Sequence, residues 1–99
     1  MTVIEGVLQE ERERNLWMQN MYLQEISELP KGSIVKKSMP SGVYYYLKYR
    51  NGDKVVSDYL GKNIEKVNQI EQAIAKRKHL EATVKRIRIE LKQIAKVVK

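Results

Sequence analysis

The spacing of hydrophobic residues predicts a helix over residues 1–29. Thr2, followed three residues later by Glu5, matches a capping box at a helix start. Pro30 ends the pattern, because the residue before a proline is disfavoured in a helix. Two polar residues, Glu11 and Asn15, interrupt the hydrophobic stripe, so we expect it to be broad or bent. The hydrophobic residues of this stripe are Ile4, Leu8, Met18, Tyr22, Ile26 and Leu29.

The middle of the chain has the pattern of a small antiparallel sheet. We expect strands over Ser33–Lys37, Val43–Tyr49 and Lys54–Leu60, because β-branched and aromatic residues suit a pleated surface. The pair Asn51-Gly52 is a strong hairpin signal between the last two strands. The sequence Met-Pro-Ser-Gly at 39–42 predicts the other turn.

The register of the second hairpin has two alternatives. A two-residue loop at Asn51-Gly52 places Tyr49 opposite Lys54, whereas a three-residue loop with a bulge places Tyr49 opposite Val55. We adopt the second register, because it separates hydrophobic from polar side chains more cleanly. It places on the core side Val43, Tyr45, Leu47, Tyr49, Val55 and Tyr59. It places on the solvent side Tyr44, Tyr46, Lys48, Arg50, Lys54 and Asp58.

Residues 63–98 predict one long helix. In its second half the hydrophobic residues step by four and three, which is the spacing of a coiled-coil seam. Upstream, Val67, Ile70 and Ile74 step by three and four in a different phase, and the break falls within 75–80. Such a shift changes the supercoiling or marks where the helix changes its packing partner. The downstream seam comprises Leu80, Val84, Ile87, Leu91, Ile94 and Val98.

Together these elements predict an α+β fold in a single domain of residues 1–99. It has a helix over 1–29, a hairpin-centred sheet of two or three strands over 31–61 and a helix over 63–98. We expect the two helices to pack antiparallel. We also expect a homodimer through the C-terminal helix, because a chain of 99 residues buries only a thin core. The predicted partner or dimer interface comprises Leu80, Val84, Ile87, Leu91, Ile94 and Trp17.

A bulky hydrophobic patch on the first helix has two interpretations. Trp17, Met18, Met21 and Tyr22 lie close together along this helix. They are either part of the core or a docking surface for a partner protein, where Trp, Tyr and Met are enriched.

The net charge of +7 is unevenly distributed along the chain. Residues 1–30 hold six acidic and two basic side chains, residues 31–62 hold two acidic and seven basic, and residues 63–99 hold four acidic and ten basic. The basic segments either bind a polyanion such as nucleic acid, or the acidic first segment complements the basic last one in a helical pair.

The residue pattern does not suggest catalysis or metal binding. The chain has no cysteine, which removes disulfides, thiolate metal sites and cysteine nucleophiles. His79 is the only histidine and lies among basic residues, so we expect an ordinary polar helix residue rather than a metal ligand. We find no paired carboxylates, no nucleophile with its base and no glycine-rich phosphate loop. The expectation is a protein that is not an enzyme and has no cofactor, metal or small-molecule substrate.

The sequence also predicts a cytoplasmic protein without a membrane partner. The N-terminus is acidic and amphipathic rather than basic and then hydrophobic, unlike a signal peptide. No hydrophobic run approaches the roughly 18 residues that a membrane span needs.

Two groups of residues are candidate nucleic-acid contacts. On the hairpin, aromatic rings can stack on bases and cations can neutralise phosphates; alternatively, the lysines protect an edge strand from pairing. On the long helix, a basic row can follow phosphates; alternatively, it is a solvated face. The hairpin group comprises Tyr44, Tyr46, Lys48, Arg50 and Lys54. The helix group comprises Arg77, Lys78, Lys85, Arg88 and Lys92, and its row extends to Lys99.

The stretch LPKGSIVKK, followed by YYYLKYRNGDKVVSDYLGK, resembles an uncharacterised family of small bacterial and phage-borne proteins. This resemblance covers about residues 29–62. More loosely, the hairpin is similar to the arm-type DNA-binding domains of tyrosine recombinases, which place a small sheet packed on a helix against DNA. That similarity is one of fold and implies DNA contact by Tyr46, Lys48, Arg50 and Lys54, without the recombinase catalytic domain.

Three functions follow as hypotheses. The first is a non-catalytic nucleic-acid-binding accessory protein of a phage or mobile element. The second is a protein-interaction module, such as a phage-encoded inhibitor of a host defence nuclease (an anti-CRISPR type), which docks on that nuclease or its guide RNA. The third is a structural coiled-coil adaptor. A steep salt dependence favours the first, and salt-insensitive binding to one protein favours the second.

Overall fold

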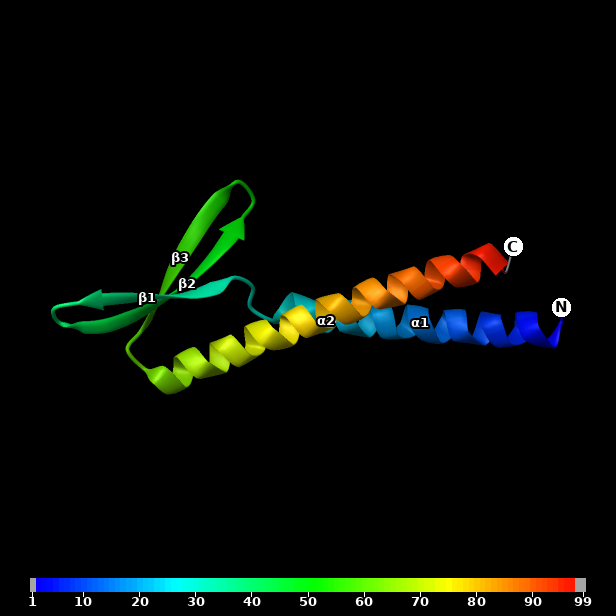
Figure 1. Cartoon of the computed structure of the whole chain (residues 1–99), viewed down its shortest axis with the longest axis horizontal. Coiled ribbons are helices and arrows are strands. Elements are labelled where there is room, and N and C mark those ends of the chain that lie inside the picture. Colours follow the sequence, from blue (N-terminus) through cyan, green and yellow to red (C-terminus); the bar gives the residue numbers. More distant parts are fainter. Residues whose placement is uncertain (1, 98–99) are drawn as a thin grey trace. The chain divides into compact units, whose positions relative to one another are not determined.

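The computed structural model describes residues 2–97 and has an α+β fold (Figure 1). The predicted order of a helix, a small antiparallel sheet and a long helix is confirmed, and every predicted boundary lies within a few residues of the observed one. The elements are helix α1 (Val3–Glu28), strands β1 (Ser33–Met39), β2 (Gly42–Asn51) and β3 (Lys54–Gly61), and helix α2 (Ile64–Val97).

The chain forms two compact units, whereas the sequence analysis treats it as one domain. The first, which we call the helical unit, consists of α1 and the part of α2 that begins at Lys78. The second, the sheet unit, consists of Leu29–Arg77 and contains the three strands and the first part of α2. Helix α2 is continuous and contributes to both units.

The change of hydrophobic phase in α2 coincides with the boundary between the two units. Val67 and Ile74 are buried in the sheet unit, and Leu80 is the first buried residue of α2 in the helical unit. Ile74 and Leu80 are six residues apart rather than the seven of a heptad, which rotates the buried side by roughly a third of a turn. The phase break therefore marks where α2 changes its packing partner, and the helix is not interrupted there.

The sheet is antiparallel in the order β1-β2-β3, and its second hairpin has neither of the two predicted registers. Asn51 pairs with Lys54, so the loop residues are Gly52 and Asp53. Gly52 has a φ of 65°, and in the described chain only glycines have positive φ. This combination fits a type II′ turn, which requires glycine at its first loop position. The turn therefore begins one residue later than the Asn-Gly signal suggests.

This register exchanges the β3 residues between the two faces of the sheet, because a shift of one residue turns every side chain to the other side. Val55 and Tyr59, predicted on the core side, lie on the face of Tyr46 and are 54% and 58% exposed. Lys54 and Asp58, predicted on that face, lie on the opposite one. The pairs between β2 and β3 include Tyr46 with Tyr59, Leu47 with Asp58, Lys48 with Ser57, Tyr49 with Val56 and Arg50 with Val55.

Gly32 permits a close approach between the start of β1 and strand β2. Its φ is 115°, a conformation that other residues rarely adopt. A Cβ at this position would collide with the carbonyl oxygen of Lys48 and lie 2.9 Å from the Cβ of Tyr49. The backbone can therefore take this path only with glycine.

In the helical unit, α1 and α2 run antiparallel, as predicted (Figure 1). Most of the seam of α2 is buried in this unit. From α1, Asn15 and Ile26 are buried, while Leu91 of α2 is half-buried. The buried seam residues are Leu80, Val84, Ile87 and Ile94. The seam is thus covered within one chain and is not the exposed dimer surface that the sequence analysis expects, because α1 occupies it. Val98, the last predicted seam residue, lies outside the described residues, and the homodimer itself stays a prediction.

Candidate functional site

Three tyrosines come together on one face of the sheet. Tyr44 and Tyr46 are alternate residues of β2, so their side chains point to the same side, and Tyr59 of β3 pairs with Tyr46. The ring centroids of Tyr46 and Tyr59 are 5.4 Å apart, and those of Tyr44 and Tyr59 are 6.2 Å apart. Both pairs are tilted, an arrangement that aromatic rings favour. The three rings therefore form one continuous aromatic surface.

Lysines lie over two of these rings. The Lys37 Nζ is 4.9 Å from the ring centre of Tyr46, and the Lys62 Nζ is 4.8 Å from that of Tyr44. At these distances the ammonium groups are attracted to the negative faces of the rings. We use the name tyrosine face for the set Lys37, Tyr44, Tyr46, Lys48, Arg50, Tyr59 and Lys62.

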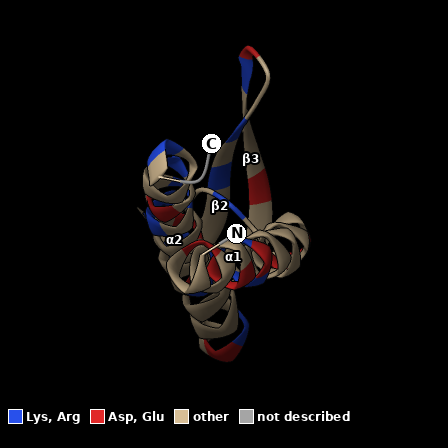
Figure 2. Ribbon diagram, turned by 90° about the vertical axis from the view of Figure 1, so that its right-hand side faces the viewer, with Lys and Arg blue, Asp and Glu red and all other residues tan. Residues whose placement is uncertain are grey.

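The tyrosine face carries four cations, and the described strands place no acidic side chain on this side of the sheet. Lys48 and Arg50 continue along β2 and are exposed, and within residues 2–97 neither side chain has an ion-pair or hydrogen-bond partner. Asp58 lies on the opposite face together with Lys36 and Lys54. Figure 2 shows Lys and Arg in blue on β2 and an acidic position in red on β3. The structure thus brings together four residues of the predicted hairpin group and separates Lys54 from them.

Tyr44 and Tyr49, on opposite faces of β2, have opposite electrostatic surroundings. The Tyr44 hydroxyl shares a hydrogen bond of 2.7 Å with the Ser41 hydroxyl, and Lys62 donates to the Ser41 carbonyl oxygen at 3.0 Å. The Ser41 hydrogen bond and the nearby Lys62 ammonium lower the pKa of Tyr44. The negative charge of Asp58 raises the pKa of Tyr49. The carboxylate nearest to a β2 tyrosine thus lies on the face opposite the tyrosine face.

Arg77, which the sequence analysis includes among the nucleic-acid contacts, has a structural contact. Its Nη1 donates to the carbonyl oxygen of Leu29 at 2.6 Å, and its side chain is half-buried. Leu29 directly follows α1, and a carbonyl at a helix end has no partner within the helix. Arg77 therefore joins the first and last residues of the sheet unit.

The other residues of the predicted helix group form an exposed basic row on α2, in the helical unit. Lys78, Lys85 and Lys92 are spaced by seven residues, so they repeat along one side of the helix every ~10 Å. Arg88 lies between the last two. The side chains of this row are exposed while most of the seam is buried, and Lys99 lies outside the described residues. The tyrosine face and the basic row belong to different units.

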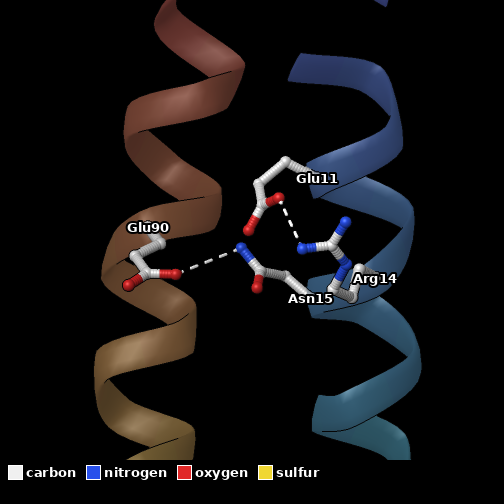
Figure 3. A network of polar contacts seen from close by, with 4 residues as sticks. All are labelled: Glu11, Arg14, Asn15 and Glu90. Carbon is white, nitrogen blue, oxygen red and sulfur yellow. Dashed lines mark hydrogen bonds and ion pairs between the residues drawn. The ribbon is translucent and has the colours of Figure 1, made fainter. Parts of the chain in front are cut away.

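A polar contact lies within the helical pair (Figure 3). Asn15 is only 1% exposed, and its Nδ2 donates to Oε2 of Glu90 at 3.2 Å. On the same helix, Arg14 and Glu11 form an ion pair of 3.1 Å. From the sequence alone, Asn15 is predicted only to interrupt the hydrophobic stripe. Its position within that stripe is the signal that could have identified it, because asparagine at a core position of paired helices fixes their register.

The helical pair leaves part of its hydrophobic surface uncovered. A furrow of about 380 Å³ adjoins the Asn15–Glu90 contact, with Leu8 and Ile94 in its walls. On α1, Trp17 and Met21 are 63% and 50% exposed. The interpretation of this patch as core is therefore wrong for Trp17 and Met21, and the alternative, a docking surface, stays a prediction.

Two further kinds of feature, a metal site and a membrane-spanning helix, are not found among the described residues. Residues 2–97 contain no group of three or more His, Cys, Asp or Glu that could hold a metal ion. None of the described helices is both long and hydrophobic enough to cross a membrane. His79 is an exposed residue of α2.

Residues 7–69, more than half of the chain, match the family described as a domain of unknown function, DUF6788. The chain belongs to this family. No curated protein and no solved structure matches the chain. The DUF6788 segment contains most of α1 and the whole tyrosine face, and it ends in the first part of α2. Arg77 and the basic row lie beyond it.

Proposed function

We propose that this DUF6788 chain is a non-catalytic nucleic-acid-binding protein that contacts its ligand through the tyrosine face. The observation that supports this function is the placement of three tyrosine rings among four cations, with no acidic side chain on the same face. Rings of this kind stack on bases of any sequence, and Lys and Arg side chains neutralise the phosphates that connect them. The setting that we propose is an accessory protein of a phage or mobile element.

The tyrosine face is a better candidate for the primary contact than the basic row of α2. The row offers cations only, so it can add phosphate contacts but cannot stack on bases. On the tyrosine face, Tyr59 is 58% exposed, and the side chains of Lys48 and Arg50 have no partner within residues 2–97. Lys48 and Arg50 therefore lose no hydrogen bond or ion pair when they bind a ligand.

Fluorescence anisotropy with labelled single-stranded DNA, duplex DNA and structured RNA tests this function. If the four cations of the tyrosine face each neutralise one phosphate, affinity falls roughly 50-fold for a single strand and roughly 150-fold for a duplex between about 50 and 200 mM salt. The strand type that binds best then identifies the ligand class.

A matched pair of variants locates the contact. Lys48→Gln/Arg50→Gln removes two charges from the tyrosine face, and Lys36→Gln/Lys54→Gln removes two charges from the opposite face. We expect the first variant to lose about half of the salt dependence and the second to bind like the unmodified chain.

Two outcomes contradict the proposal. Equal losses in both variants would indicate binding by net charge alone. No binding at low salt, together with salt-insensitive stoichiometric binding to one protein, would favour the alternative of an anti-CRISPR-type inhibitor or a coiled-coil adaptor.

A further inference from the structure

Helix α1 carries a second row of residues, separate from the stripe that packs in the helical unit. Its members step by four, three, four, three and four residues, so they stay on one side of the helix in the manner of a coiled-coil seam. The row consists of Val3, Val7, Glu10, Arg14, Trp17 and Met21. Its hydrophobic members are exposed: Val3 by 85%, Val7 by 58%, Trp17 by 63% and Met21 by 50%. This seam has no partner within the described chain.

The row is self-complementary when a second copy of α1 runs in the opposite direction. In antiparallel coiled coils the a positions of one helix lie opposite the d positions of the other. A two-fold axis at residue 12 then sets hydrophobic residues opposite hydrophobic ones and an acid opposite a base. The resulting layers are Val3 with Met21, Val7 with Trp17 and Glu10 with Arg14, each formed twice.

We propose that α1 docks antiparallel against α1 of a second copy of this chain. A two-fold interface requires a surface that complements itself, and the order of charges in this row meets that requirement. An unrelated partner helix would impose no such order. Arg14 and Glu11 are 62% and 43% exposed in the ion pair that they form within α1, so exchanging this ion pair for the contact with Glu10 of the second copy costs little.

This contact differs from the homodimer that the sequence analysis expects through α2, because that seam is buried within one chain. It is also independent of the proposed nucleic-acid binding, since it uses no residue of the tyrosine face. Failure of one proposal therefore leaves the other intact.

The single tryptophan makes the contact measurable. Trp17 is exposed in one chain and faces Val7 of the second copy in the dimer, so its emission should shift to shorter wavelength as protein concentration rises. Sedimentation equilibrium over the same concentrations should show the mass of two chains. A chain that stays monomeric with constant emission at every concentration overturns the proposal.

Charge reversals test the antiparallel order. Glu10→Arg and Arg14→Glu each set like charges opposite one another in both central layers, and we expect each to weaken the dimer about tenfold. An equimolar mixture of the two variants should form heterodimers as tight as the unmodified dimer, because every central layer again joins opposite charges. Repulsion within one helix would be unchanged in that mixture, so recovery isolates the contact between chains.

Arg12→Glu is the matched control for Arg14→Glu. Arg12 is exposed and only two residues away, but it lies on another side of α1. We expect this variant to keep the dimer, with circular dichroism confirming that all variants retain their helices. A dimer that responds equally to both reversals, or a mixture that does not recover, overturns the antiparallel contact.

Discussion

Asn15 lies where two purely hydrophobic helices would pack a leucine, and 1% of its surface is exposed. Its amide donates to Glu90, a residue that remains exposed to solvent. A buried asparagine that makes such a contact selects one alignment of two helices and lowers the stability that a hydrophobic residue would give. We therefore assign to Asn15 the role of keeping α1 and α2 in register.

Two substitutions of Asn15 separate packing from hydrogen bonding. Asn15→Ala leaves a void and removes the partner of Glu90, so we expect the free energy of unfolding to fall by about 1–2 kcal/mol. Asn15→Leu fills the space while Glu90 stays hydrated, so we expect unchanged stability or a gain of about 1 kcal/mol. Urea unfolding followed by circular dichroism measures both. A leucine variant that loses as much stability as the alanine variant would show that the hydrogen bond, rather than packing, holds the pair.

At the scale of single elements, sequence reasoning found what a strand or helix determines by itself. The phase break in α2 is a property of one segment and is confirmed. The alternation along β2 correctly groups the side chains by face, but residues 42–47 are all half-buried, so it does not separate a core side from a solvent side. The pairing of β2 with β3 depends on the loop. The loop begins at Gly52 rather than Asn51, and this difference places Tyr59 on the opposite face from the one predicted. Tyr59 was therefore missed as a member of the tyrosine face.

Gly32, which precedes β1, and Gly52, in the loop of the second hairpin, differ in how well they tolerate a side chain. At Gly32 a Cβ would meet Lys48 and Tyr49, so we expect Gly32→Ala to lower the free energy of unfolding by ~3 kcal/mol or more. A Cβ at Gly52 would meet no neighbouring atom within 4 Å. We therefore expect Gly52→Ala to lower the free energy of unfolding only by the cost of its positive φ, ~1 kcal/mol. Thermal unfolding of both variants measures the difference, and equal losses would contradict the close approach at Gly32.

At the scale of the whole molecule, the candidate contacts were only partly accessible to sequence reasoning. Residues two positions apart on one strand, such as Lys48 and Arg50, share a face and could be grouped from the alternation of β2. Lys37 and Lys62 join them from other segments, because Lys37 pairs with Tyr44 across the sheet and Lys62 reaches the Tyr44 ring from beyond β3. The hydrogen bond from Arg77 to the Leu29 carbonyl joins residues 48 positions apart. The sequence alone gives no sign of this contact, and Arg77 is therefore predicted as a surface cation.

That hydrogen bond between Arg77 and Leu29 also closes the sheet unit at its two ends. It holds the first and last residues of the sheet unit within the reach of one side chain. A segment whose two ends meet is an insertion that can be removed without separating what flanks it. Replacing residues 29–77 by a short glycine-rich turn should therefore leave a helical hairpin of α1 and the remainder of α2, visible as helical circular dichroism. Helicity that disappears would mean that the sheet unit is needed for the helices to fold; helicity that persists would make residues 29–77 a cassette that other helical hairpins can carry.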